Sequence, residues 1–362
     1  MIVLNKNDYN KNELSNKINS FQIATTYIGT VVGAGFASGQ EVLQFFGYYG
    51  VGGFIGLILT TLLFIIYGYI ILSLGKKFSA NSYLEVIRYA GGKWLVRVID
   101  LIISIFLFGV FTTMVAGSGA IFSELLGIPS IWGNLVMITA ALSTAILGIG
   151  GVVSAISYIV PLLIFGIFFM VIKSIMGSIP ITLDIFQKVV TAQAPIFHWS
   201  LSAIIYVSYN LIIAIAVLAP LGAEIEDDSK LKKGAILGGI GLGTGGIAIL
   251  FILLLYLPEV SNFEVPMSHI AGKFAPWFQI GYSLILLTEI YTTAVSNLYG
   301  FVIRLTDNNY RYKMYLYLTS IGGLIVSQAG FSNLVYYLYP VVGYVGILLM
   351  VGLTLGYIRA RG

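Results

Sequence analysis

The stretch GTVVGAGFASGQE, residues 29–41, decides the fold. It lies inside a long apolar segment, yet it carries four glycines together with the polar residues Ser38, Gln40 and Glu41. Glycines and polar side chains at mid-membrane weaken a helix, and irregular backbone is tolerated inside a bilayer only where protein or a water-filled cavity surrounds it. The glycines also have the spacing of close helix packing, but packing alone does not require the polar residues. We therefore expect a transmembrane helix that is broken within residues 29–41.

The whole chain has the composition of a membrane protein. Of its 362 residues, 58% are hydrophobic and only 9% are charged, and its mean hydropathy is +0.95. About a quarter of the residues of a soluble domain are charged, so lipid must be the main solvent here. At about 20 apolar residues per span, the sequence predicts an all-α protein with a single transmembrane domain, residues 20–362. The ten predicted spans are 20–48, 51–75, 96–125, 130–149, 152–175, 197–222, 233–257, 276–304, 313–330 and 334–358.

The positive charges set the expected topology. If the chain crosses the membrane ten times, all of the 19 Lys and Arg residues except Lys173, Lys188 and Lys273 fall on one side of it. Cytoplasmic loops are the ones enriched in Lys and Arg. Residues 1–19 lack the apolar core and cleavage pattern of a signal peptide, so we expect a cytoplasmic tail and both termini inside. The net charge of +4 forms no basic face, which argues against a nucleic-acid partner.

Several local patterns have structural explanations. The run GLGTGG at 241–246 fits a dinucleotide-binding fingerprint, but no strand precedes it, so we expect close helix packing instead. Residues 77–93 mix apolar and charged side chains, which predicts a short amphipathic segment at the cytoplasmic interface. Asp100 and Glu124 fall at predicted span ends, where we expect them to face water or headgroups. Cysteine is absent, and the two histidines lack metal-ligand spacing.

The chain divides into two candidate repeats, residues 20–175 and 197–358. The span that opens the second repeat contains the polar run 206–210, with Pro220 and Gly222 near its inner end, so we expect a second interruption there. Interrupted helices at matching positions in two halves of a chain point to the binding site of a secondary transporter. We find no phosphate-binding loop and no nucleophile–base pair, which argues against an ATP-driven pump and against an enzyme.

Residues 33–41, GAGFASGQE, resemble a signature of YkvI-type bacterial membrane proteins, and this resemblance extends over nearly the whole chain. More distantly, the sequence is similar to branched-chain amino acid carriers of the BrnQ type and to the amino acid–polyamine–organocation superfamily. The resemblance implies the LeuT fold, in which five spans are followed by five more in inverted orientation, with spans one and six broken. It also implies a bacterial cytoplasmic membrane as the location.

Sodium-coupled members of this superfamily hold an ion between spans one and eight. The resemblance places the carbonyls of Gly29 and Val32 and the hydroxyls of Thr292 and Thr293 at that site, with the carbonyl of Glu289 one turn earlier. Oxygen ligands suit sodium, although a mid-membrane threonine often bonds only a carbonyl of its own helix. Phe36 stands where a second sodium would need an amide, which argues against a second ion. No residue pattern of the transition-metal carriers is present. Apart from a sodium ion, no cofactor is expected.

Two carboxylates lie within predicted spans, Glu41 and Glu289. Charged groups at this depth are costly, and they usually face the bundle interior or a cavity. Glu41 is a candidate to gate the entrance, to bind a substrate amine or to take up a proton, and Glu289 is a candidate for proton coupling. The alternative for both is a hydrogen-bonded structural carboxyl group.

For the substrate, the backbone amides of Gly33, Ala34 and Gly35 begin a half-helix, whose N-terminal end favours an anion such as the carboxylate of an amino acid. We expect polar contacts and side-chain walls from spans three and six. The candidates are Ser208 and Asn210 for polar groups, and Phe108, Thr112, Tyr206 and Tyr209 for the walls.

These features predict ion-coupled uptake of a small zwitterionic molecule, with an amino acid as the leading candidate, by alternating access. Sodium is favoured over a proton as the coupling ion. The alternative is a ligand sensor that keeps the transporter fold without turnover, similar to spore-germinant receptor subunits. The sequence leaves the oligomeric state open.

Overall fold

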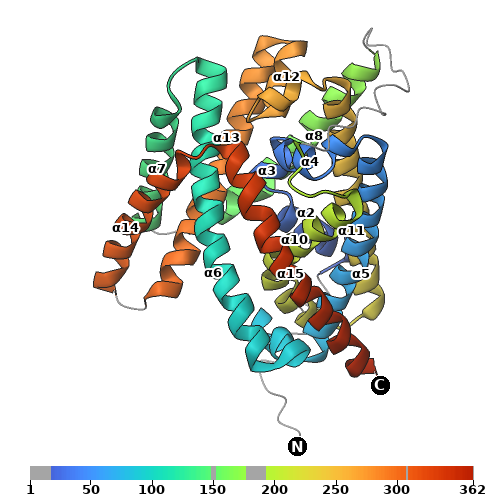
Figure 1. Ribbon diagram of the computed structural model, residues 1–362. Coiled ribbons are helices and arrows are strands. Elements are labelled where there is room, and N and C mark those ends of the chain that lie inside the picture. The colour runs from blue at the N-terminus through green and yellow to red at the C-terminus, as the bar shows by residue number, and fades with distance from the viewer. Residues whose placement is uncertain (1–17, 148–151, 177–192, 307–308, 362) are drawn as a thin grey trace, which may run out of the picture.

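The computed structural model describes residues 18–147, 152–176, 193–306 and 309–361 (Figure 1). Within these ranges every regular element is a helix. The first half contains α2 (Ser20–Val31), α3 (Ala34–Ala37), α4 (Gln40–Phe45), the 3-10 turn η1 (Gly47–Tyr49), α5 (Val51–Lys77), α6 (Tyr83–Leu126), α7 (Ser130–Leu147) and α8 (Val152–Met176). The second half contains α10 (Trp199–Ala223), α11 (Asp228–Leu255), η3 (Glu259–Asn262), α12 (Pro266–Phe274), α13 (Pro276–Leu305), α14 (Asn309–Ser327) and α15 (Phe331–Arg361).

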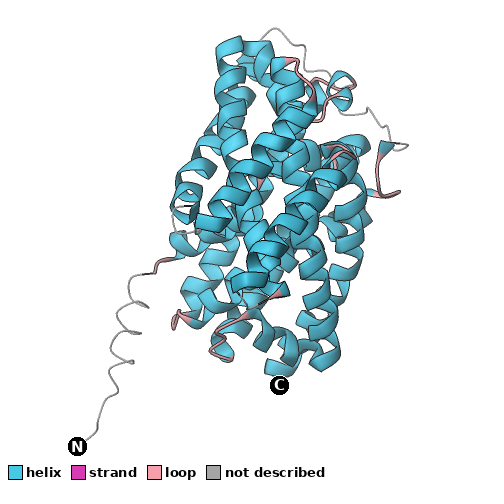
Figure 2. Cartoon of the chain, turned by 90° about the vertical axis from the view of Figure 1, so that its left-hand side faces the viewer, coloured by secondary structure: helices cyan, strands magenta, loops and turns pink. Residues whose placement is uncertain are grey.

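The helices follow the ten predicted spans, with α2 to α4 together forming the first. Among the described residues, five helices are each long and apolar enough to cross a membrane, namely α5, α6, α10, α11 and α15, and two shorter apolar helices cover residues 130–146 and 161–176. The long helices of the bundle run roughly along one axis (Figure 2). Of the predicted N-terminal tail, residues 1–17 lie outside the described part, and Asn19 caps α2 in a reciprocal capping box with Gln22.

The break in the first span is confirmed. The N–H of Val32 donates to Ile28 O (2.7 Å), and α2 ends there because Val32 and Gly33 are extended (Gly33 φ −124°, ψ −175°). A helix end leaves its last carbonyls without intrahelical partners. One short turn, α3, follows, and Gly39 then adopts a left-handed conformation (φ 82°) that favours glycine. The chain therefore bends twice inside the bundle.

The expected interruption in the span that opens the second half is wrong, because α10 is continuous through residues 206–210. Its polar side chains are satisfied without unwinding the backbone. The Ser208 hydroxyl lies 2.6 Å from Gly343 O of α15, and Asn210 Nδ2 donates to Tyr206 O (2.9 Å). Pro220 falls in the last turn, three residues before the helix ends.

The packing of the helices repeats between the two halves. α5 packs on α10, and its counterpart α11 packs on α2. In the same way α6 packs on α15, and its counterpart α13 packs on α8. The contact of α6 with α14 in turn corresponds to the contact of α13 with α7. Equivalent pairs of this kind are what an inverted five-plus-five repeat requires. In Figure 1, α6 crosses the molecule between the α7–α14 pair and the helices α5, α10, α11 and α15.

The glycine-rich run of α11 serves helix packing, as predicted. A Cβ built on Gly243 would lie 1.9 Å from Thr61 Oγ1 of α5, and one on Gly241 would lie 2.5 Å from Ile28 Cδ1 of α2. Small residues let helix backbones approach closely in a membrane. The glycines therefore bring α11 against α2 and α5 at the same time.

The segment predicted to lie at the interface forms the first turns of α6. Ser82 caps it, with Glu85 completing a capping box, and the helix kinks at Gly91 and Gly92, where Gly92 has φ 71°. Near this kink Asp100 accepts a hydrogen bond from Arg304 of α13 (2.7 Å), so it forms an ion pair instead of only facing water as expected.

We predict that Gly243→Ala lowers the thermal unfolding midpoint of the purified protein, because overpacking against the stiff Thr61 side chain costs about 1–3 kcal/mol. Gly281→Ala in α13 is the matched control, since its added Cβ would have no neighbour within 4 Å and alanine gains about 1 kcal/mol of helix propensity over glycine. Equal midpoints for the two variants would contradict close packing at Gly243.

Candidate substrate and ion site

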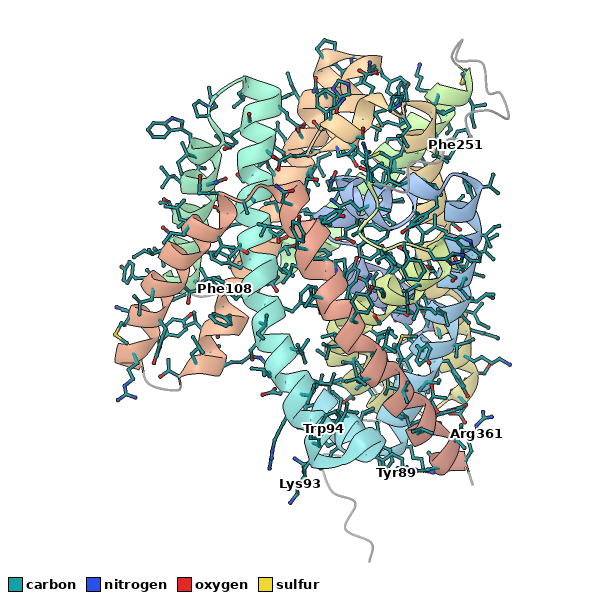
Figure 3. All side chains as sticks on the ribbon, viewed as in Figure 1. Tyr89, Lys93, Trp94, Phe108, Phe251 and Arg361 are labelled. Atoms are coloured by element: carbon teal, nitrogen blue, oxygen red, sulfur yellow. The ribbon has the colours of Figure 1, made fainter. Side chains whose placement is uncertain are left out.

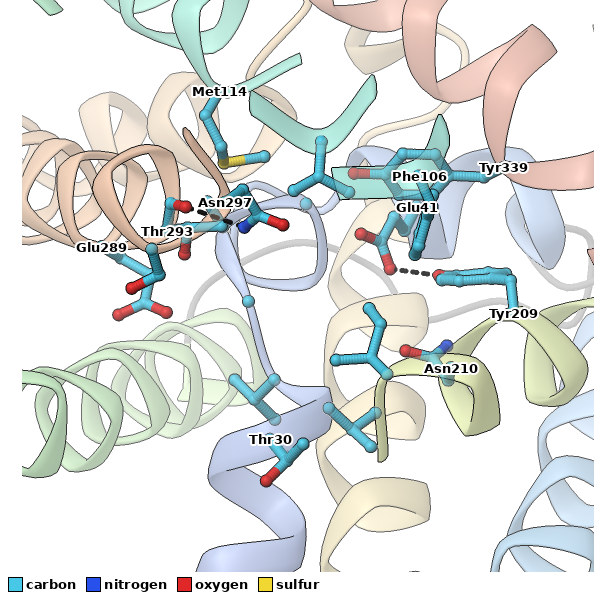
Figure 4. Close-up of a pocket in the computed structure, with 18 of the residues that line it drawn as sticks. Thr30, Glu41, Phe106, Met114, Tyr209, Asn210, Glu289, Thr293, Asn297 and Tyr339 are labelled. Carbon is cyan, nitrogen blue, oxygen red and sulfur yellow. Dashed lines mark hydrogen bonds between the residues drawn. The ribbon is translucent and has the colours of Figure 1, made fainter. Parts of the chain in front are cut away.

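A cavity of about 190 Å³ lies at the break between α2 and α3 (Figure 4). Its walls come from the broken span and from α6, α10, α13 and α15. Of the residues that the sequence predicted, it brings together Gly29, Val32, Gly33, Ala34, Gly35, Glu41, Tyr209, Asn210, Glu289 and Thr293. The remaining lining residues are Thr30, Val31, Phe106, Val110, Met114, Ile213, Ser296, Asn297 and Tyr339.

Glu41 lies on the side of the cavity formed by α10 and α15. Its carboxylate Oε2 accepts a hydrogen bond from the Tyr209 hydroxyl (2.5 Å), and the residue is only 6% exposed. A Cβ built on Gly35 would lie 1.9 Å from Glu41 Oε1, so only glycine admits this close approach. The carboxylate thus lies against the backbone at which the sequence led us to expect a substrate carboxylate.

Three aromatic rings surround this carboxylate. Tyr209 and Tyr339 have ring centroids 5.1 Å apart, Phe106 and Tyr339 5.6 Å, and Phe106 and Tyr209 6.1 Å. Figure 4 shows Glu41 between the Phe106–Tyr339 pair and Tyr209. Tilted and edge-to-face contacts of this kind hold aromatic rings in fixed relative positions. The rings therefore form a rigid apolar wall around one charged group.

The opposite side of the cavity comes from α13. Glu289 is only 3% exposed, and its Oε2 is buried without a hydrogen-bond partner among the described residues. Thr293 lines the cavity one turn further along, and Asn297 Nδ2 donates to Thr293 O (2.7 Å). The Thr292 hydroxyl instead donates to Glu289 O (3.0 Å), so two of the predicted ion ligands bond to one another.

Five predicted site residues do not line the cavity, Thr292 among them. Phe108 packs against Phe301 with centroids 5.4 Å apart (Figure 3), and the Thr112 hydroxyl donates to Gly109 O (2.8 Å). Tyr206 is fully buried among aromatic rings behind Tyr209, and Ser208 contacts α15. For span three the prediction selected the wrong face of the helix.

Three of the lining residues that the sequence analysis missed share one face of α6. Phe106, Val110 and Met114 are spaced by four residues, which places them on one face. Residues 108 and 112 share a different face of the same helix. The direction of each face depends on the rotation of α6, which is set by its packing on α13 and α15.

The charge of the cavity is uniform in sign. Its described lining residues include two carboxylates, Glu41 and Glu289, and no Lys, Arg or His. No group of three or more His, Cys, Asp or Glu that could hold a metal is found in the part of the chain that the structure describes. Buried carboxylates without basic partners favour cations or protons.

Hydrogen bonds close the bundle between this cavity and α12. Gln40 Nε2 donates to Ser332 Oγ (2.5 Å), and Gln44 Nε2 donates to Ser332 O (2.9 Å), which joins α4 to α15. The hydroxyl of Tyr282 donates to Ala37 O (2.6 Å), joining α13 to α3. We call these contacts the α12-end seal.

The loop before α12 takes part in the same closure. Glu264 Oε2 accepts a hydrogen bond from Phe331 N (2.5 Å), and Glu124 Oε1 accepts one from Glu264 N (2.6 Å). The expectation that Glu124 faces water or headgroups is therefore wrong. It binds the backbone of the α12 loop, and that loop in turn binds the first residue of α15.

The relatives of the chain agree with this architecture. It is 33% identical to the membrane protein YkvI of Bacillus subtilis (strain 168) over 327 residues, which cover 90% of this chain and 92% of YkvI. The chain belongs to the YkvI family of membrane proteins. It is also 27% identical to the protein YyaD of the same strain, over 91% of this chain and 94% of YyaD. No protein-family model matches the chain.

Solved structures show the fold of this YkvI-family member. The inward-facing conformation of Mhp1 superposes with a TM-score of 0.70 at 16% identity, covering 92% of this chain and 76% of Mhp1. MhsT in complex with L-phenylalanine superposes with a TM-score of 0.60 at 15% identity, covering 90% of this chain and 87% of MhsT. A Na⁺-coupled sialic acid symporter superposes with a TM-score of 0.57 at 15% identity, covering 94% of this chain and 79% of the symporter. The fold is thus the LeuT fold that the family resemblance implied.

We predict that Ser332→Ala weakens the α12-end seal. Losing the contacts of its hydroxyl costs about 1 kcal/mol, which corresponds to roughly a fivefold increase in opening. The chain has no native cysteine, so a single Val335→Cys, a buried position one turn along α15, reports the opening through its maleimide labelling rate.

The control for this labelling experiment is Asn333→Ala. Asn333 is the exposed neighbour of Ser332, and its amide bonds only Ala329 O (2.9 Å). Faster labelling in both variants, or in neither, would show that the Ser332 contacts do not hold this end closed.

Proposed function

We propose that the chain is a cation-coupled secondary transporter that moves a small amine-bearing substrate, such as a zwitterionic amino acid, by alternating access. The observation that carries this proposal is a cavity at a helix break, lined by two carboxylates and no basic residue. In LeuT-type folds the unwound backbone lies where substrate and coupling ion bind. The Na⁺-coupled sialic acid symporter and MhsT with L-phenylalanine share the fold, which supports transport of a polar organic molecule.

We further propose a sodium site between α2 and α13. The carbonyls of Gly29 and Val32 lie at the open end of α2, and Thr293 faces them across the cavity. The Glu289 carboxylate, buried on the same helix as Thr293, supplies a negative charge beside these oxygens. Thr292 joins this ligand set only after its hydroxyl leaves the carbonyl of Glu289. Oxygen donors of this kind suit a hard cation.

Alternating access follows from the way the cavity is closed. On this proposal the α12-end seal closes one route, and the cavity exchanges with the other end of the bundle. That end carries Lys93, Trp94 and Arg361 (Figure 3), in accordance with a cytoplasmic face and with both termini inside a bacterial cytoplasmic membrane. Opening of the seal would expose the cavity to the outside.

We predict that sodium raises the thermal unfolding midpoint of the purified protein in choline buffer, and that Thr293→Ala abolishes this shift. A ligand at a hundredfold excess over its Kd stabilises the folded state by about 2.7 kcal/mol. Thr288→Ala on the same helix is the matched control, because Thr288 is exposed and bonds only Leu284 O (2.9 Å).

If sodium has no effect at any pH, the sodium site is wrong, and coupling passes to protons at Glu41 or Glu289. Uptake into proteoliposomes then separates the transporter from the sensor. A transporter accumulates a labelled substrate when an ion gradient is imposed, whereas a sensor binds the substrate without accumulating it.

A further inference from the structure

The two carboxylates of the cavity serve different sites. Figure 4 shows Glu289 beside Thr293 on one side and Glu41 beside Tyr209 and Tyr339 on the other. Glu289 lies close to the helix-end oxygens that suit a bare ion. Glu41 lies instead among aromatic rings and against the Gly35 backbone, and it accepts a hydrogen bond from the Tyr209 hydroxyl. The second carboxylate therefore calls for a different kind of cation.

We propose that Glu41, together with Phe106, Tyr209 and Tyr339, forms a subsite for an ammonium group, and that this group is the part of the substrate that the protein selects. The proposal rests on the proposed function only in assuming that the cavity binds a substrate. It assigns the substrate class as small organic amines, with or without a carboxylate.

The position of Glu41 excludes an anion from the same place. Its carboxylate lies against Gly35, so a substrate carboxylate at residues 33–35 would meet a like charge in a site of low dielectric. The Tyr209 hydroxyl donates to Oε2 (2.5 Å) and so fixes the orientation of the carboxylate. A cation next to Glu41 is therefore stabilised by the negative charge of the carboxylate and by the fixed orientation of its oxygens.

The three rings match the apolar part of an ammonium group. Cations are attracted to the faces of aromatic rings within about 6 Å, and aromatic cages with a nearby acid recognise alkylated ammonium groups. Phe106, Tyr209 and Tyr339 pack on one another, with centroid distances of 5.1–6.1 Å, and all three line the cavity, so a small group in the cavity meets aromatic surface from more than one ring.

The remaining polar groups of the lining also favour an amine. Asn210 Nδ2 donates to Tyr206 O (2.9 Å) and Asn297 Nδ2 donates to Thr293 O (2.7 Å), which leaves their amide oxygens as acceptors. The cavity of about 190 Å³ is smaller than the range of about 300–1,000 Å³ that is typical of drug-sized ligands. The substrate is therefore small.

The test uses three probes that share the isobutyl side chain of leucine: leucine itself, 3-methylbutylamine, which lacks the carboxylate, and 4-methylpentanoate, which lacks the amine. Tetramethylammonium is the fourth probe. Binding is measured on the purified full chain as a shift of the thermal unfolding midpoint at saturating sodium. We expect shifts with ammonium compounds and none with 4-methylpentanoate. A shift with the acid alone, or no shift with any ammonium compound at millimolar concentration, overturns the proposal.

Three variants locate the subsite. Glu41→Gln keeps the size and the acceptor for Tyr209 but removes the charge, and we expect it to weaken amine binding at least tenfold. Phe106→Leu keeps the carboxylate and is expected to weaken tetramethylammonium binding several-fold. Glu259→Gln changes a half-exposed carboxylate that pairs with Lys273 outside the spans, and it should bind like the wild type. Unchanged amine affinity in folded Glu41→Gln or Phe106→Leu protein overturns the subsite.

The outcome separates this proposal from the proposed function. Glu41-dependent amine binding without accumulation in proteoliposomes would support the subsite and contradict transport. Ion-driven accumulation that is indifferent to Glu41→Gln would support transport and overturn the subsite.

Discussion

A backbone inside a bilayer must satisfy its own hydrogen bonds, and the rest of this structure depends on that constraint. At Val32 and Gly33 the chain leaves the helix, so the carbonyls at the end of α2 lose their next partners. Such a segment persists only if protein surrounds it. The helices α6, α10, α13 and α15 provide that enclosure, and the cavity is the space that they leave around the break.

The two halves of the inverted repeat contribute different kinds of polar group to the cavity. The first half exposes backbone at Val32 and Gly33, whereas the second keeps α10 helical and presents side chains, Tyr209 and Asn210, to the cavity. Charge comes from Glu41 in the first half and from Glu289 in the second. A site built from unlike halves can hold two unlike cations, since each half contributes its own carboxylate and its own kind of neighbour.

The sequence was sufficient for the spans, for the break at residues 29–41 and for the packing role of the α11 glycines, because each has a signal in composition or spacing. It could not orient the faces of α6, since the rotation of a long apolar helix is set by its neighbours. Phe108 and Thr112 were predicted to line the site, whereas Phe106 and Val110 line it in the structure. The position of the Glu41 carboxylate against Gly35 could not be predicted from the sequence either. A straight helix would carry it away from Gly35, but the left-handed Gly39 turns the chain so that its carboxylate lies against that residue.

Gly39 also connects α3, which lines the cavity at Ala34 and Gly35, to the segment around α12. The N–H of Met267, at the start of α12, donates to Ser38 O (2.9 Å), and the Met267 side chain packs so closely on Gly39 that an added Cβ would lie 2.7 Å from its Cγ. The one-turn α3 is therefore bonded to α12 at its Gly39 end and lines the cavity at its Gly33 end. A single turn of helix joins the α12 segment to the wall of the cavity.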